Sequence, residues 1–177
     1  MSVPRRRPTR AETGFLLLFH ATLSGAFLVA WLTGDEDTYG MHLFAGYAVL
    51  AALAVRTATG LLAPAGSPLR LPHPSMVALA GWLRRLAAAG PGAAGRSPLY
   101  AWMAVAMLGF ATAVAASGWL ADRLGPVEDL HEALAELTPA VIAAHVAIVA
   151  ALQWLGRRGA RPVATPADGG LARAPSA

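Results

Sequence analysis

The sequence contains no cysteine and no lysine among its 177 residues, and only 14% of its residues are charged. Without cysteine the chain can form no disulfide, iron–sulfur cluster, thiolate-ligated haem or zinc–thiolate site. Any metal must therefore be bound by histidine, carboxylate, methionine or tyrosine. A hydrophobic share of 56% together with so little charge also argues against a soluble globular domain.

Signatures of several common functions are missing as well. No nucleophile–base arrangement, phosphate-binding loop or nucleic-acid-binding motif rises above chance in the sequence. The net charge of +4 could point to an anionic partner, but the arginines are segregated in a way that membrane topology explains better.

Long apolar segments dominate what the sequence does contain. A bilayer core of about 30 Å needs about 20 apolar residues in each helical span. Four segments reach that length, at about residues 13–33, 41–63, 98–121 and 127–156. The sequence therefore predicts an all-α integral membrane four-helix bundle over residues 13–156. A segment of residues 1–12 precedes this domain, and a disordered cytoplasmic tail of residues 157–177 follows it.

The distribution of arginine predicts how this bundle is oriented. Arginines precede the first span, lie between the second and third spans and follow the fourth, whereas the opposite loops hold only Arg123. The clustered residues are Arg5, Arg6, Arg7, Arg10, Arg70, Arg84, Arg85, Arg96, Arg157, Arg158, Arg161 and Arg173. The positive-inside rule then places both termini in the cytoplasm. Between the second and third spans we expect a short amphipathic helix over residues 76–89, with Trp82 at the membrane interface.

Four of the five histidines fall within or at the ends of the spans: His20, His42, His131 and His145. Ionisable residues in membrane helices are costly and usually face the bundle interior or a functional path. His131 and His145 are 14 residues apart, so they share one helix face about 21 Å apart. His20 lies about 20 Å from the outer end of the first span, and His42 begins the second. The two pairs therefore occupy matching depths.

Paired histidines at two depths suit two haem groups. A haem iron takes an axial imidazole on each face, so its ligands come from different helices that face a common gap. We expect His42 with His131 near the outer surface and His20 with His145 deeper in the membrane. Gly46 and other small residues would leave room for a flat macrocycle, although close helix packing explains them equally well. Arg56 would pair with a haem propionate or extend to the cytoplasmic interface.

Several short motifs together resemble one known family. They are FH at 19–20, MHLFAGY at 41–47, VRTATG at 55–60, SPL at 97–99, EDLHE at 128–132 and AHV at 144–146. In order and spacing they resemble the prokaryotic di-haem b-type cytochromes, which include the cytochrome subunit of nickel–iron hydrogenase and the bacterial cytochrome b-five-sixty-one proteins. The sequence departs from that family at Arg96-Ser97, where many relatives have His-Asn, and at Ala21-Thr22, where aromatic residues are frequent.

The resemblance implies haem b ligation by the four matching histidines. It also implies a multi-pass protein of the bacterial inner membrane that exchanges electrons between quinone or quinol and a redox partner protein or subunit. Whether the chain forms a homodimer or part of a quinone-linked oxidoreductase stays open. An alternative is a haem-free membrane anchor or assembly subunit, in which the histidines only pack and form hydrogen bonds. A metal transporter would need acidic or methionine residues at mid-membrane depth, and the sequence has none there.

Overall fold

The computed structural model describes residues 6–159, with only the backbone at residues 91–94, 158 and 159. All regular structure in this part of the chain is helical, as the sequence predicts. The elements are α1 (Arg10–Leu32), η1 (Glu36–Thr38), α2 (Tyr39–Leu62), α3 (Met76–Ala94), α4 (Leu99–Ala121), η2 (Gly125–Val127) and α5 (Glu128–Gly159). Residues 1–5 of the predicted N-terminal segment and residues 160–177 of the predicted tail lie outside the described residues.

Four helices are long and apolar enough to cross a membrane: α1, α2, α4 and α5. Their bounds agree with the predicted spans to within three residues at every end. Large apolar side chains cover the outside of these helices, and Phe44 is 78% exposed while Leu62 is 84% exposed. Apolar surface of this extent is stable in lipid rather than in water. The chain therefore has the character of a multi-pass membrane protein, and the predicted all-helical fold is confirmed.

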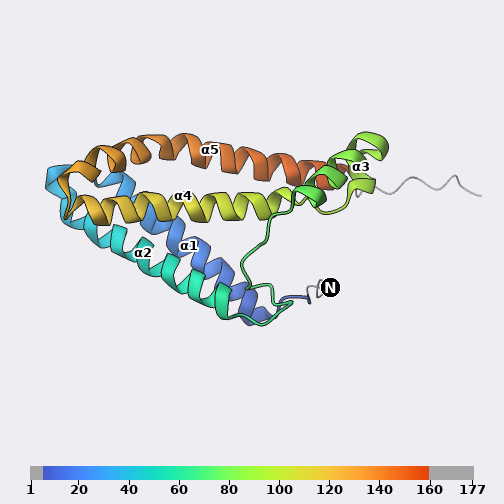
Figure 1. Ribbon diagram of the computed structural model, residues 1–177, viewed down its shortest axis with the longest axis horizontal. Coiled ribbons are helices and arrows are strands. Elements are labelled where there is room, and N and C mark those ends of the chain that lie inside the picture. The colour runs from blue at the N-terminus through green and yellow to red at the C-terminus, as the bar shows by residue number, and fades with distance from the viewer. Residues whose placement is uncertain (1–5, 160–177) are drawn as a thin grey trace, which may run out of the picture.

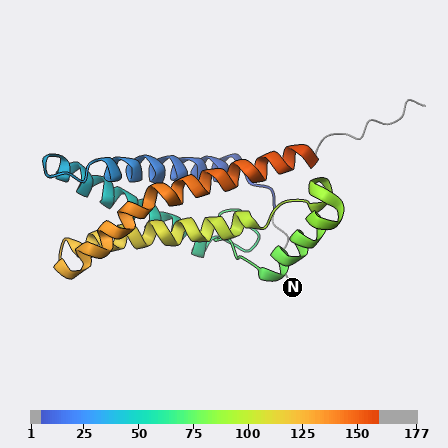
Figure 2. The same ribbon diagram turned by 90° about the horizontal axis from the view of Figure 1, so that it is seen from above.

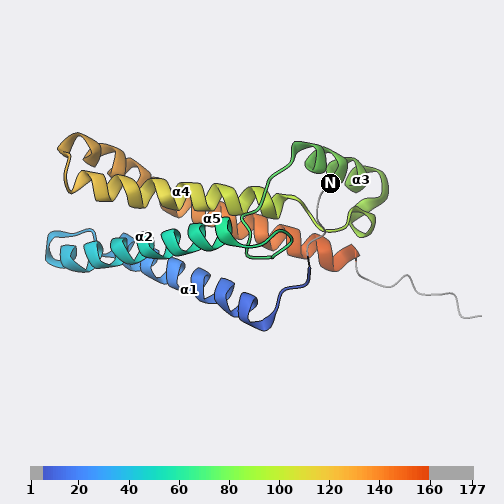
Figure 3. The ribbon, with the colours of Figure 1, turned by 60° about the horizontal axis from the view of Figure 1, so that its bottom comes forward.

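The four long helices form two antiparallel hairpins, α1 with α2 and α4 with α5 (Figure 1). The hairpins meet through α2 and α4, whereas neither α1 nor α2 is packed along α5. Figure 1 shows the hairpins close together at the η1 and η2 turns and diverging toward the opposite end, and Figure 3 shows α1 swinging away from α5. The core where they meet is small, with Val49 and Leu53 of α2 packed against Ala111 of α4.

The first hairpin begins at a well-capped helix. Thr9 caps α1 in a capping box with Glu12, whose carboxylate accepts two bonds from Arg6 at 2.6 and 2.8 Å. The same carboxylate accepts a bond from Ser67 at 3.0 Å. These contacts tie the start of α1 to the segment that follows α2. Both ends of the described chain lie at the end of the bundle opposite η1 and η2 (Figure 2).

The connection between the hairpins contains the expected short helix. α3 begins at the Ser75 cap and its regular helical backbone is interrupted at Gly90, where φ is 75°. The predicted end at residue 89 matches this interruption. The side chain of Trp82, for which we expect an interfacial position, is only 4% exposed and packs against Leu152 of α5. The docking of α3 against α5 therefore covers Trp82.

Candidate functional site

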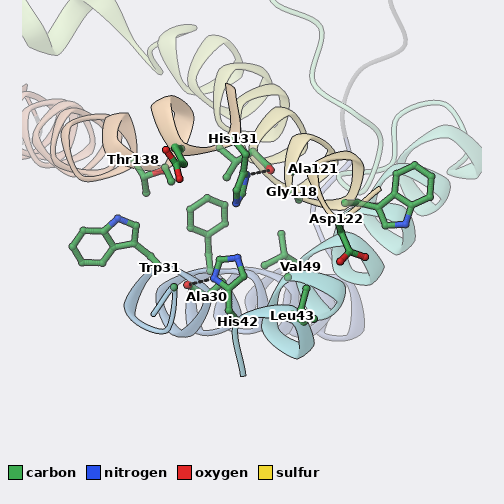
Figure 4. Close-up of a pocket in the computed structure, with 18 of the residues that line it drawn as sticks. Ala30, Trp31, His42, Leu43, Val49, Gly118, Ala121, Asp122, His131 and Thr138 are labelled. Atoms are coloured by element: carbon green, nitrogen blue, oxygen red, sulfur yellow. Dashed lines mark hydrogen bonds between the residues drawn. The ribbon is translucent and has the colours of Figure 1, made fainter. Parts of the chain in front are cut away.

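The structure brings two of the four predicted histidines together at the closed end of the bundle, where the η1 and η2 turns lie and the hairpins are close together. His42 lies near the start of α2 and His131 near the start of α5. The centres of their imidazole rings are 6.0 Å apart, with the ring planes 75° from parallel. Figure 4 shows the two side chains pointing toward one another from opposite hairpins. The predicted outer pairing is therefore present as a ring contact.

A backbone carbonyl fixes the orientation of the His42 ring. Nδ1 of His42 donates a hydrogen bond to the carbonyl oxygen of Ala30 at 2.7 Å (Figure 4). Tyr39 stacks on the same ring with the ring centres 6.0 Å apart. A carbonyl oxygen can only accept, so Nδ1 carries a proton, and in the neutral imidazole Nε2 then has the lone pair.

The His131 ring is held in the same way by α4. Its Nδ1 lies 3.1 Å from the carbonyl oxygen of Val114 and 3.2 Å from Oγ of Ser117. The Ser117 hydroxyl donates its own proton to the Val114 carbonyl at 2.9 Å, so its oxygen accepts from the ring. Both partners of Nδ1 are acceptors, so in the neutral ring Nε2 of His131 again has the lone pair.

The chemical consequence is a pair of imidazoles that each present a lone pair on Nε2. Two such nitrogens cannot hydrogen-bond to each other, because neither has a proton to donate. Imidazoles that bind metals show this arrangement, with the distal N–H given to a carbonyl or carboxylate that fixes the tautomer. The donor set at this site therefore suits a metal held between the two rings.

Small residues make space for these rings. A Cβ atom at Gly118 would lie 2.8 Å from Cε1 of His131, so the ring rests directly against the α4 backbone. Gly46, which the sequence analysis selects, has open space where a Cβ would be and lines the adjoining cavity. Gly118 therefore gives room to the His131 ring, and Gly46 leaves space beside the histidines that is compatible with a bulky planar group.

The histidines open onto a cavity of about 510 Å³. All four long helices contribute to its lining, including Phe27 of α1, Val49 of α2, Val114 of α4 and Thr138 of α5. The volume lies within the range of about 300–1,000 Å³ that is usual for cofactor sites. Apolar residues make up most of the lining, which also holds four carboxylates: Asp122, Glu128, Glu132 and Glu136. Figure 4 shows Trp31 and Asp122 on opposite sides of this space.

The second predicted pair is not in contact. His20 is exposed on α1, where its Nδ1 shares a hydrogen bond with Ser24 at 3.0 Å. His145 is half-buried on α5, and its Nδ1 is buried without a hydrogen-bond partner. The structure records no ring contact between them. The hairpins diverge at this level, so the two helices are held apart.

The depths of the second pair also differ by about one helical turn. The level of His42 on α1 is marked by Ala30, which lies ten residues, or about 15 Å, from His20. On α5, fourteen residues, or about 21 Å, separate His131 from His145. The matching depths expected for this pair are therefore offset by about 6 Å.

Arg56 is buried near the open end of the bundle, where the two hairpins diverge. Only 6% of the residue is exposed, and Nη1 donates to the Leu69 carbonyl at 2.8 Å. Its guanidinium lies 6.0 Å from the centre of the Phe19 ring, next to His20 in sequence. Among the described residues no carboxylate forms an ion pair with it. The side chain therefore turns toward the loop after α2 but is covered, rather than extending freely to an interface.

The groups that orient the outer histidines were not predicted from the sequence. They are the carbonyls of Ala30 and Val114, the Ser117 hydroxyl and the stacked Tyr39 ring. Only the position of Ser117, fourteen residues before His131 across a short turn, offered any signal in the sequence.

Comparisons with known protein families, with curated proteins and with solved structures found no match. Within the described residues no three histidine, aspartate or glutamate side chains gather as they do around a bare metal ion. This does not bear on a haem, whose iron needs only two protein ligands.

Proposed function

We propose that the chain is a b-type electron-transfer cytochrome that binds two haems within the membrane. The observation that carries the proposal is the outer histidine pair, in which hydrogen bonds fix both Nδ1 atoms and so leave Nε2 of each neutral imidazole as the metal-binding nitrogen. His42 and His131 would bind the outer haem, and His20 and His145 the inner haem. Arg56 would bind a propionate, and Gly46 would give room to a macrocycle.

The spacing of the outer pair supports an iron between the rings. The ring centres are 6.0 Å apart, which is compatible with a metal between the rings, because a metal–imidazole bond is about 2.0 Å long. Helices whose histidines bind opposite faces of one haem cannot pack on each other, and neither α1 nor α2 packs along α5.

A haem supplies reversible one-electron transfer at its iron. The residues of this chain would hold it, fix its axial imidazoles and exclude water with the apolar lining of the cavity. The hydrogen bonds to Nδ1 make each imidazole a stronger donor and so favour the oxidised iron. Two haem sites at different depths would let electrons cross much of the membrane.

The charges indicate how the protein is oriented in the membrane. Apart from Arg123, the described arginines gather toward the end that holds α3, whereas the η1 and η2 end holds the acidic residues Asp35, Glu36, Asp37, Glu128 and Asp129. We propose that the α3 end is cytoplasmic and that the protein resides in a bacterial inner membrane. Together with the resemblance to di-haem b-type cytochromes, this supports electron exchange between the quinone pool and a partner protein or subunit.

A haem-free membrane anchor is the second candidate. It is favoured by the T-shaped contact of His42 with His131, because aromatic rings 4.5–7 Å apart are also an ordinary packing arrangement. In that case each ring would serve only to join the hairpins. The two functions differ in one measurable property, which is bound haem.

The test is a reduced-minus-oxidised visible spectrum and a haem-to-protein ratio on the full chain purified in detergent. We expect a b-type spectrum and two haems per chain, with one haem lost in His42→Ala and in His131→Ala. His73→Ala is the matched control, because His73 is exposed in the loop before α3. A folded sample supplied with haem that shows no b-type spectrum would overturn the proposal and leave the anchor function.

A further inference from the structure

Helix α3 docks on the bundle through one of its faces. Trp82 packs against Leu152 of α5. Leu79 and Leu86, one turn before and one turn after Trp82, pack against the same cluster. The Trp82 indole also donates a hydrogen bond to the Gly95 carbonyl at 3.4 Å. These contacts fix the rotation of α3 about its own axis and so decide which of its side chains point away from the protein.

The side of α3 that is turned away from the bundle carries an apolar stripe. Its members are exposed and recur at helical spacing: Met76, Ala80, Leu83 and Ala87. At about 100° per residue they fall within about 60° of one another, centred about 130° from Trp82. Met76 is 68% exposed and Leu83 is 49% exposed, so the described part of the chain leaves this stripe uncovered.

The stripe lies at the level where the membrane spans end. α3 packs against Leu99 and Tyr100, which begin α4, and against Leu152 near the end of α5. Figure 1 shows α3 beside this end of α5. Tyr100 and Trp154, which is 52% exposed, are of the aromatic types that gather at membrane–water interfaces. A helix at this level with an outward apolar stripe is placed to lie on the bilayer surface.

The charge around the stripe is positive. Among the described residues Glu12 is the only carboxylate at this end of the bundle, and Arg6 binds it. Arg84 is exposed and borders the stripe, about 70° from its centre. Arg85 lies on the opposite side, where its Nη1 is 3.5 Å from the position of a Cβ at Gly81. No described carboxylate forms an ion pair with either arginine, so Arg84 is available to an anion beside the stripe.

We propose that α3 lies on the membrane surface and binds an anionic phospholipid. The apolar stripe enters the boundary between headgroups and acyl chains, and Arg84 binds the headgroup phosphate. A guanidinium suits this role because its planar fork of N–H donors matches two phosphate oxygens. The positive charge of this end favours a lipid of net negative charge over a zwitterionic one. This contact is separate from the proposed haem sites and does not depend on them.

A fluorescent label on α3 tests where the stripe lies. The chain has no cysteine, so Ala87→Cys can carry a single bimane within the stripe. Ala88→Cys is the matched control, because this neighbouring alanine is equally exposed but lies about 100° further round the helix. Phosphatidylglycerol or phosphatidylcholine with brominated acyl chains is titrated into the labelled full chain in detergent. We expect phosphatidylglycerol to quench the label at residue 87 at the lower concentration, and both lipids to quench the label at residue 88 much less.

Two adjacent arginines test the headgroup contact. A basic residue near an anionic surface strengthens binding about fivefold. We therefore expect Arg84→Gln to raise the half-quenching concentration of phosphatidylglycerol for the label at residue 87 about fivefold, with that of phosphatidylcholine unchanged. Arg85→Gln removes the same charge from the opposite side, and Arg84→Lys keeps the charge, so both should have smaller effects.

Three results would overturn the proposal. A label at residue 87 that neither lipid quenches would show that a protein surface, such as a second copy of the chain, covers the stripe. Equal quenching by the two lipids, or at the two labelled positions, would exclude an oriented contact with anionic lipid. Equal effects of Arg84→Gln and Arg85→Gln would exclude a specific contact of Arg84 with the headgroup.

Discussion

His42 and His131 face each other across the closed end of the bundle with ring centres 6.0 Å apart, although the helices that carry them do not pack together. Each ring is fixed by a backbone carbonyl of the neighbouring helix in its own hairpin, α1 for His42 and α4 for His131. Each hairpin thus fixes the orientation of one imidazole ring, and the two rings come into contact where the hairpins meet. A change in either hairpin should therefore alter the site by moving one of the rings.

The first prediction concerns Gly118→Ala. The added methyl would lie 2.8 Å from Cε1 of His131, so the ring must move and its bonds to Val114 and Ser117 must lengthen. We expect the outer haem to be lost or weakly held, and the inner haem to remain.

Haem-to-protein ratios for Gly118→Ala and for Gly109→Ala measure this effect. Gly109 lies on the same helix and has open space where a methyl would be, so its variant should retain both haems. Equal haem content in the two variants would contradict a role for Gly118 in seating His131.

The second prediction concerns the hydrogen bonds behind the iron-binding nitrogen. Ser117→Ala removes one of the two acceptors of His131 Nδ1 and leaves the Val114 carbonyl. Loss of such partners typically weakens metal binding about 10–100-fold. With one acceptor retained we expect about a tenfold faster loss of haem to apomyoglobin, near the low end of that range.

Thr112→Ala is the control for Ser117→Ala. Its hydroxyl donates to the Leu108 carbonyl on the exposed side of the same helix, away from the histidines. A Ser117→Ala protein that releases haem no faster than Thr112→Ala would show that the serine does not support the ligand.

Much of the fold could be predicted because membrane spans are specified by length and apolarity. The outer histidine pair was predictable for a related reason. His42 and His131 each lie in the first turn of a helix that follows a short connection, so their depth follows from the spans alone. Their orienting partners could not be predicted. The carbonyls of Ala30 and Val114 carry no residue-specific signal, since every residue has one.

The inner site could be predicted only in part. The depths of the four histidines were calculated along ideal straight helices. In the structure the two hairpins diverge toward the α3 end and leave His20 and His145 out of contact. The burial of Trp82 could not be predicted from the sequence either. Its burial depends on the docking of α3 against α5, which the apolar pattern does not reveal.

The third prediction concerns the docking of α3. Trp82 is 4% exposed against Leu152, and removal of a buried tryptophan side chain costs about 3–5 kcal/mol. Trp82→Ala should therefore release α3 from α5, which hydrogen exchange would show as faster exchange in α3 alone. Haem content should not change. Leu83→Ala, at a neighbouring residue that is 49% exposed, should keep normal protection. Equal protection in both variants would mean that Trp82 does not anchor the helix.

The fourth prediction concerns orientation in the membrane. The chain has no cysteine, so a single introduced thiol can be labelled without background. Asp37 lies exposed in η1 and Ser75 lies exposed at the start of α3, at opposite ends of the bundle. Because the arginines gather at the α3 end, we expect Asp37→Cys to react with a membrane-impermeant maleimide in intact spheroplasts. Ser75→Cys should react only after the membrane is opened. The reverse pattern would invert the orientation, and the outer histidine pair would then lie at the cytoplasmic face.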